Sequence, residues 1–159
     1  LDVQARLGAP EMLEMTRDQS LSVTVFVGES RGSATTTDLS DAALESTLQA
    51  ALAIARVTAP DPAAVLASND QIIRDVPKLE LDHPWDISAK DALALAIEVE
   101  ACGRQADPRI TNSEGGSVSS TRGLSIHGTT EGLLVSRPTS VHGLSCVLLA
   151  EDGESRERS

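Results

Sequence analysis

The chain has 159 residues, of which 40% are hydrophobic, so it is long and apolar enough to bury the core of one ordinary domain or of two small repeats that share a core. Its formal net charge is −11, which leaves no broad positive surface for nucleic-acid phosphates or anionic lipid. With one Phe, one Trp and no Tyr, the chain lacks the residues of a base-stacking platform, and its core must be aliphatic.

Two antiparallel hairpins are expected in the first 37 residues. Residues 1–7 and 12–17 flank a Gly-Ala-Pro turn, which is the first hairpin signal. From Leu21 to Val27, aliphatic residues occupy every second position, which is the period of a half-buried strand. The turn residues of 28–32 follow, and 33–37 is the expected return strand.

The first of two long helices is expected from Ser40 to about Arg56. Ser40 is a suitable N-cap, because its hydroxyl can accept a hydrogen bond from a free backbone N–H of the first turn. Leu44, Leu48 and Leu52 then recur every four residues, which places them on one helix face. We expect this face to be buried against a sheet.

The second long helix is expected to begin at Ser88, with Asp91 at the capping-box position, and to end at Gly103. Its apolar residues are Ala92, Leu93, Ala96, Ile97 and Val99. We expect this helix to cover a sheet as well and to bury Leu93 and Ile97.

The remaining segments are a linker, further strands and a polar tail. Asp61-Pro62 is expected to start a short helical turn through Leu66, and residues 74–87, with two prolines and mixed charges, are the expected linker. The last nine residues are almost wholly polar and are expected to fray. Four strands separated by glycine-containing turns are expected after Arg109, at 110–120, 123–128, 132–136 and 141–150.

These elements predict an α+β fold, with antiparallel β-hairpin sheets in two weakly similar halves packed against two long helices. We expect a single domain over 1–150, with halves 1–73 and 88–150, followed by the polar tail 151–159. The similarity between the halves rests on a short sequence similarity between residues 16–23 and residues 121–126. Chance similarity between Ser/Thr/Gly-rich hairpins is a fair competing explanation.

Residues for catalysis or metal binding are not grouped in this sequence. A zinc peptidase needs two His ligands one helical turn apart and a nearby carboxylate, but His83, His127 and His142 stand isolated. Neither a GxSxG elbow nor a phosphate-binding glycine motif is present. Cys102 and Cys146 are expected to be reduced thiols whose role is to pack against neighbouring side chains. The residues therefore predict no catalytic, metal-binding or cofactor-binding site in this chain.

Trp85 is the most conspicuous single residue, and it lies in a His83-Pro-Trp-Asp86 motif just before the second helix. Trp85, with His83 beside it, is a candidate partner contact, because Trp is enriched where interfaces are held most tightly. The alternative, which we favour, is a Trp that seals the aliphatic core where the linker enters the helix.

Five motifs, taken together and in order, resemble the N-terminal domain of the PmbA/TldD family. The motif His83-Pro-Trp-Asp86 is more similar to the PmbA (TldE) branch than to the TldD branch. Each motif is weak alone, but the ordered set extends over nearly the whole chain. The five are Arg17–Leu21, Gly32–Leu39, Ala50–Arg56, His83–Asp86 and Asp107–Gly115.

The resemblance implies a cytoplasmic bacterial or archaeal protein whose β-rich C-terminal domain lies beyond this chain. In that family the zinc motif belongs to the TldD subunit, and PmbA-type subunits act as the non-catalytic half of a heterodimer. It implies a TldD-type partner, zinc in that partner, and unfolded peptides of microcin or antitoxin type as substrates. No family catalytic residue can be carried onto a position of this chain.

An alternative function comes from the family's older description as modulators of DNA gyrase. The chain would then belong to a regulatory binding protein that acts on gyrase or a toxin–antitoxin system without proteolysis. The charge of −11 argues against direct contact with DNA. No apolar stretch has the length of a membrane span, and no signal-peptide region is recognisable, so neither membrane insertion nor export is expected.

The Ser/Thr-rich hairpins 23–37 and 117–136 suggest how a peptide could be held. An extended peptide can add to an open strand edge through backbone hydrogen bonds, with little dependence on its sequence. Equally, these edges could be paired within the sheets or covered, as native proteins usually arrange.

Overall fold

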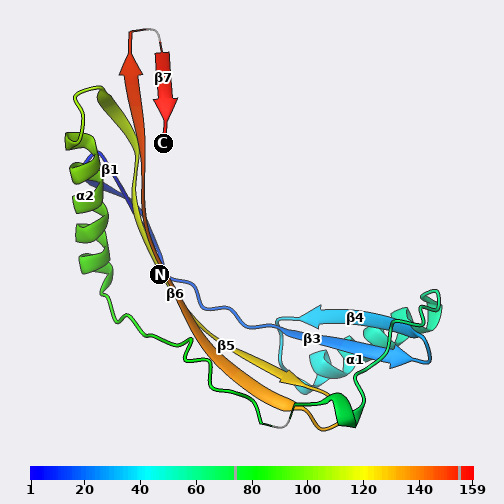
Figure 1. Ribbon diagram of the computed structural model, residues 1–159. Helices are drawn as coiled ribbons and strands as arrows, with labels where there is room; N and C mark the ends of the chain where they lie inside the picture. Colours follow the sequence, from blue (N-terminus) through cyan, green and yellow to red (C-terminus); the bar gives the residue numbers. More distant parts are fainter. Residues whose placement is uncertain (74, 154) are drawn as a thin grey trace. The chain divides into compact units, whose positions relative to one another are not determined.

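The computed structural model describes residues 1–73, 75–153 and 155–159, and these divide into two compact units (Figure 1). Unit 1 contains Leu1–Thr16, Val76–Gly128 and Leu134–Ser159. Unit 2 contains Arg17–Asp75 and Thr129–Leu133. Each unit combines an antiparallel sheet with one long helix, so the predicted α+β class is confirmed.

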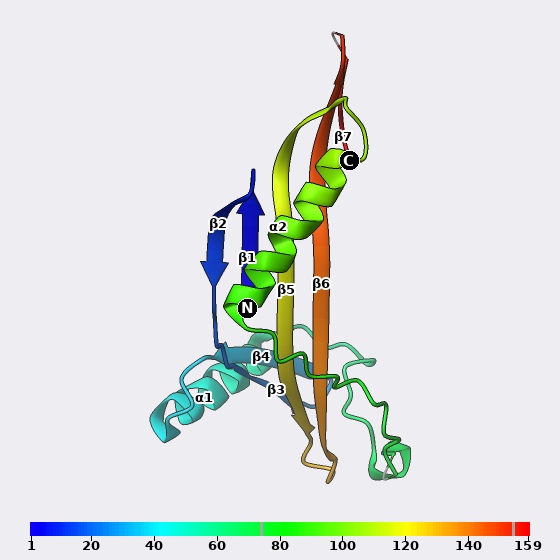
Figure 2. The ribbon, with the colours of Figure 1, turned by 90° about the vertical axis from the view of Figure 1, so that its left-hand side faces the viewer.

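Unit 1 is built on a five-stranded antiparallel sheet with the strand order β2-β1-β5-β6-β7. Helix α2 (Ala89–Gln105) lies across one face of this sheet (Figure 2). Residues 1–16 belong to this unit because β1 pairs with β5, from Asp2 opposite Ser119 to Ala5 opposite Gly116. The strands are β1 (Asp2–Arg6), β2 (Ala9–Glu14), β5 (Ile110–Gly128), β6 (Leu134–Asp152) and β7 (Ser155–Arg158).

Strands β5 and β6 form one long ribbon of 19 residues each, so the prediction of four shorter strands is wrong. Gly123 stays in the ladder opposite Thr139 instead of ending a strand. Pro138 is tolerated because its position faces away from β5. Every second backbone N–H of a strand points to the same side, and the N–H of Ser140, two residues further on, points away from β5 and donates to Leu81 O at 2.9 Å. A proline at such an outward position removes no hydrogen bond from the β5–β6 ladder.

The expected fraying of the polar tail is wrong for its described residues. β7 pairs with β6 from Leu149 opposite Arg158 to Asp152 opposite Ser155, while Glu154 lies outside the described residues. Arg158 adds an ion pair of 2.7 Å to Glu114 on β5. Backbone pairing and cross-strand ion pairs thus order a segment whose composition alone is typical of a free end.

Helix α2 packs on the sheet through its smallest side chains. Its buried residues are Ala92, Ala96 and Glu100, whereas the predicted Leu93 and Ile97 are only half-buried. A Cβ at Gly116 of β5 would collide with the carbonyl oxygen of Ala96, so helix and strand backbones are in direct contact. The buried apolar cluster consists of Val3, Ala5, Ala92, Ala96 and Val118.

Unit 2 repeats this mode of packing with fewer elements. Helix α1 (Asp41–Val57) begins after Ser40, whose hydroxyl accepts from Ala43 N, so the predicted N-cap is confirmed. It covers the hairpin of β3 (Leu21–Val27) and β4 (Ser30–Thr36), and Gly32 of β4 faces Ala51 and Ala55 too closely for a side chain. The predicted burial of Leu48 is wrong: it is 42% exposed, because the helix approaches through its alanines.

The chain between the helices holds little regular structure. A turn forms at Asp61, whose carbonyl accepts from Ala64 N, and a short 3₁₀ helix η1 covers Asn69–Gln71, which the sequence did not predict. Of the expected linker, Arg74 lies outside the described residues, and 75–88 contains no helix or strand. No helix in the described part of the chain is long and apolar enough to cross a membrane.

Candidate functional site

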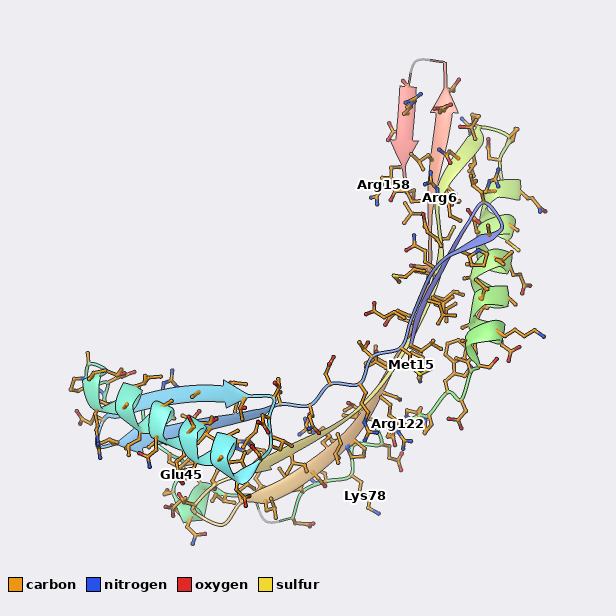
Figure 3. All side chains as sticks on the ribbon, turned by 180° about the vertical axis from the view of Figure 1, so that it is seen from behind. Arg6, Met15, Glu45, Lys78, Arg122 and Arg158 are labelled. Carbon is orange, nitrogen blue, oxygen red and sulfur yellow. The ribbon has the colours of Figure 1, made fainter. Side chains whose placement is uncertain are left out.

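The residues around His83 and Trp85 form a strap, Leu81–Asp86, that is bound to the β5–β6 ribbon. Arg122 of β5, labelled in Figure 3, donates two hydrogen bonds to the Asp82 carboxylate, from Nε to Oδ1 at 2.9 Å and from Nη2 to Oδ2 at 2.5 Å. This two-point hydrogen bond is the main cause that holds the pKa of Asp82 below its usual value. The strap therefore has a charged anchor at its first end.

The backbone of His83 binds two residues of β6. His83 N donates to Ser140 Oγ at 2.7 Å, and Ser140 Oγ donates to His83 O at 3.1 Å. His142 Nε2 lies 2.8 Å from the same carbonyl oxygen, and a carbonyl can only accept, so Nε2 carries the proton. Nδ1 of a neutral His142 then accepts from Ser120 Oγ, 3.1 Å away.

Trp85 packs edge-on against the ring of His142. The ring centroids are 5.5 Å apart and the planes are inclined by 81°, which is a favourable geometry for two aromatic rings. Trp85 stays 38% exposed and lies outside the buried cluster, which Ile87 contacts instead. The core-sealing interpretation is therefore wrong for Trp85, and a partner contact at Trp85 and His83 stays a prediction.

The other candidate residues are dispersed. His127 pairs with Val135 near the turn of the ribbon, and Cys102 is exposed on α2. Cys146 is half-buried on β6, where burial and the charge of Glu100 raise the pKa of its thiol, so it is a poor nucleophile. Among the described residues, no three His, Cys, Asp or Glu side chains are gathered as metal ligands would be.

Glu100 is a buried carboxylate that the sequence analysis missed. It is 1% exposed on α2 and accepts from Leu7 N at 2.8 Å and Gly8 N at 3.1 Å, in the turn between β1 and β2. Burial raises the pKa of Glu100, but the backbone hydrogen bonds from Leu7 and Gly8 are the main causes that outweigh it, and the charge of Arg104 adds to them, so the pKa is lowered. Its position four residues after Ala96 and eight after Ala92 places Glu100 on the buried helix face, which is the signal that could have found it.

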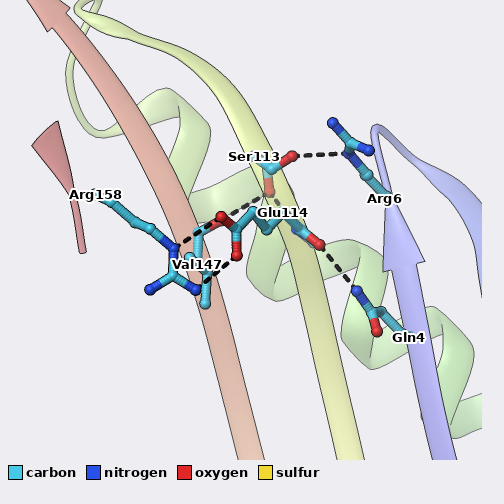
Figure 4. A network of polar contacts seen from close by, with 7 residues as sticks. Gln4, Arg6, Ser113, Glu114, Val147 and Arg158 are labelled. Atoms are coloured by element: carbon cyan, nitrogen blue, oxygen red, sulfur yellow. Dashed lines mark hydrogen bonds and ion pairs between the residues drawn. The ribbon is translucent and has the colours of Figure 1, made fainter. Parts of the chain in front are cut away.

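On strands β1, β5, β6 and β7, a polar network links residues distant in sequence (Figure 4). Arg6 Nε donates to Ser113 O at 2.9 Å, and Gln4 Nε2 donates to Glu114 O at 2.9 Å. Ser113 Oγ donates to Val147 O at 3.1 Å, and the Glu114 carboxylate accepts from Arg158. The network fixes the strand register of unit 1 beside the ribbon that carries the strap.

Two family models match successive parts of the chain. The model of PmbA/TldA metallopeptidase domain 1 matches residues 1–55, and that of the central domain matches residues 82–159. The chain belongs to the PmbA/TldD family. It is 41% identical over 99% of its length to the metalloprotease PmbA of Escherichia coli O157:H7, and 42% identical over 94% to a PmbA homolog of Haemophilus influenzae. It spans about a third of these relatives, 35% and 33%.

Solved structures of PmbA/TldD relatives have the same α+β fold. A proposed modulator of DNA gyrase from Bacteroides thetaiotaomicron aligns with a TM-score of 0.86 at 22% identity, over 99% of this chain and 36% of that one. TldE from Thermococcus kodakarensis aligns with a TM-score of 0.72 at 13% identity, over 98% of this chain and 35% of that one. At these identities the likeness establishes the fold alone.

Proposed function

We propose that this chain is a non-catalytic, peptide-holding part of a PmbA/TldE-like subunit in a TldD/TldE-type metallopeptidase assembly. Its substrates are unfolded peptides of microcin or antitoxin type, and the zinc that activates the hydrolytic water belongs to the TldD-type partner. The family match along the chain and the 41% identity to the metalloprotease PmbA support this assignment.

The observation that carries the proposal is the open outer edge of β5 beyond Ser120. β1 pairs with β5 only as far as Ser119, and Ser120 N still donates to Leu1 O. Over residues 121–128, β5 pairs with β6 on one side, and no backbone partner on the other side is found in the described ranges. An extended peptide can add there as a strand, with backbone hydrogen bonds that do not depend on its sequence.

The outer edge of β6 is less accessible, because the strap already occupies part of it. Leu81 O takes the outward N–H of Ser140, and the strap covers the ribbon as far as His142. The strap in turn presents the partly exposed ring of Trp85, an apolar anchor of the kind that interfaces use. We assign the peptide to β5 and the TldD-type partner to Trp85 with the neighbouring His83.

The test is cleavage of an unstructured peptide by the parent protein alone, by a TldD-type subunit alone and by both together. We expect cleavage in the mixture only, and weaker assembly of the mixture when the parent protein carries Trp85→Ala. Cleavage by this chain without a partner, or full activity of the partner without the parent protein, would contradict the proposal. So would an effect on gyrase supercoiling from a mixture that cleaves no peptide.

A further inference from the structure

The outer edge of β3 differs from the edge strands of unit 1. The edge strands of unit 1 carry residues that discourage pairing with other chains: β2 has a proline and two glutamates, and β7 has two arginines and a glutamate. β3 reads Leu-Ser-Val-Thr-Val-Phe-Val, without a charge, a proline or a glycine. Such a strand pairs readily wherever its backbone is free.

The hairpin geometry determines which backbone groups of β3 are free. β3 and β4 are joined by the two-residue turn Gly28-Glu29, with Val27 opposite Ser30. In such a hairpin the flanking pair exchanges hydrogen bonds, so the odd-numbered residues of β3 bond to β4. The N–H and C=O groups of Ser22, Thr24 and Phe26 then point outward, and within the described ranges no backbone group pairs with them.

The side chains of β3 also leave apolar surface next to this edge. Helix α1 lies closest to β4, where Gly32 contacts the backbone of Ala51. The aliphatic residues of β3 are consequently covered only in part: Leu21 is 38% exposed and Val27 is 41% exposed. The opposite face carries Ser22, Thr24 and the half-buried Phe26, and Thr24 Oγ1 and Ser33 Oγ are hydrogen-bonded there at 2.8 Å.

We propose that the β3 edges of two copies of this chain pair antiparallel about Thr24, which gives a continuous four-stranded sheet. Thr24 then lies opposite Thr24 of the second copy and Ser22 opposite Phe26, with about six backbone hydrogen bonds in a fully paired segment of this length. This inference concerns assembly and does not depend on the proposed function.

A second copy fits this edge because β3 is complementary to itself. With Thr24 on the twofold axis, exposed Leu21 meets exposed Val27 of the other copy, and Val23 meets Val25. All four aliphatic residues stay on the α1 side, because antiparallel pairing in this register keeps the two faces in phase. No like charges are brought opposite one another, although both copies are acidic as a whole.

The first experiment measures the mass of the 159-residue chain by analytical ultracentrifugation across a concentration series, with Thr24→Pro and Ser33→Pro as matched variants. Thr24 and Ser33 are cross-strand neighbours whose hydroxyls bond each other, and both have outward N–H groups, on β3 and β4 respectively. Each proline therefore removes the same side-chain contact and one outward donor.

We expect a monomer–dimer equilibrium that Thr24→Pro weakens at least tenfold and Ser33→Pro leaves within twofold. We also expect the dimer to tighten with added salt, which screens repulsion between two acidic copies. A monomer at every concentration, or equal effects of the two prolines, would overturn the proposal.

A crosslinking experiment decides the same question if a proline variant does not fold. In a Cys102→Ser background, Thr24→Cys places two thiols opposite each other on the twofold axis, where Cα atoms about 5.5 Å apart permit a disulfide. We expect a covalent dimer of Thr24→Cys under mild oxidation and none of Ser33→Cys, which lies about three strand spacings from its copy. Equal crosslinking of both variants, or of neither, would contradict pairing through β3.

Discussion

Replacement of Glu100 by Gln tests whether a buried carboxylate holds the β1–β2 turn on helix α2. Glu100 accepts from the backbone N–H groups of Leu7 and Gly8, at 2.8 and 3.1 Å. Leu7 has φ of 52°, a left-handed conformation that costs a residue with a Cβ roughly 1–2 kcal/mol. Gln keeps the shape but has one acceptor oxygen, so one turn N–H faces an amide NH₂ instead.

The magnitude follows from the number and kind of hydrogen bonds lost. A hydrogen bond to a charged group contributes about 1.5–3 kcal/mol, so we expect Glu100→Gln to lower the free energy of unfolding by about 2 kcal/mol. With an m-value of about 2 kcal/mol/M, the urea midpoint falls by roughly 1 M. Glu98→Gln, an exposed position on the same helix, is the control and should leave the midpoint within about 0.3 M.

The pH dependence of the difference separates this carboxylate from a general packing defect. The pKa of Glu100 is lower in the folded protein than its ordinary value of 4.5, so its stabilising contribution is fully present above pH 4.5. The contribution is lost as the pH falls through the folded pKa, where Glu100 becomes neutral like Gln. The gap in unfolding free energy between wild type and Glu100→Gln should therefore narrow below pH 4.5.

The assay is urea unfolding followed by the fluorescence of Trp85, which is the only tryptophan and belongs to unit 1. Measurements at pH 7, 5 and 3.5 lie above and below the ordinary pKa of 4.5, at which the difference should begin to narrow. An unchanged midpoint at pH 7, or a gap that stays constant down to pH 3.5, would refute the role assigned to Glu100.

Three further outcomes are expected. Asp82→Asn should change the emission of Trp85 by loosening the strap, while the urea midpoint changes little because solvent screens the ion pair to Arg122, whose side chain is 61% exposed; unchanged emission would argue against the strap. Ile126→Pro, an outward position of β5, should weaken peptide cleavage by the assembly more than Ile126→Val, and equal rates would remove β5 as the peptide site. Gly116→Ala should lower the free energy of unfolding by about 1–3 kcal/mol, measured by urea unfolding, because a Cβ there collides with the helix backbone.

Local elements were predictable because their signals lie within a few residues. Ser40 and Ser88 begin the two helices as expected, since an N-cap acts on backbone groups of the next turn. The alternation from Leu21 to Val27 marked β3 for the same reason. The family resemblance, carried by ordered motifs, is confirmed by the two domain models.

Tertiary structure alone decided the contacts between distant segments. No local pattern indicates that β1 pairs with β5, that Asp82 binds Arg122 or that the turn at Leu7 binds Glu100. Asp82 and Arg122 lie 40 positions apart, Leu7 and Glu100 lie 93 apart, and Asp2 and Ser119 of the β1–β5 pair lie 117 apart. Both helices bury alanines instead of leucines, because each packs closely on a glycine of a strand that is distant in sequence. Gly32 of β4 faces helix α1, and Gly116 of β5 faces helix α2. Periodicity indicates which helix face is apolar, but the strand opposite determines how closely the backbones pack and therefore which side chains are buried.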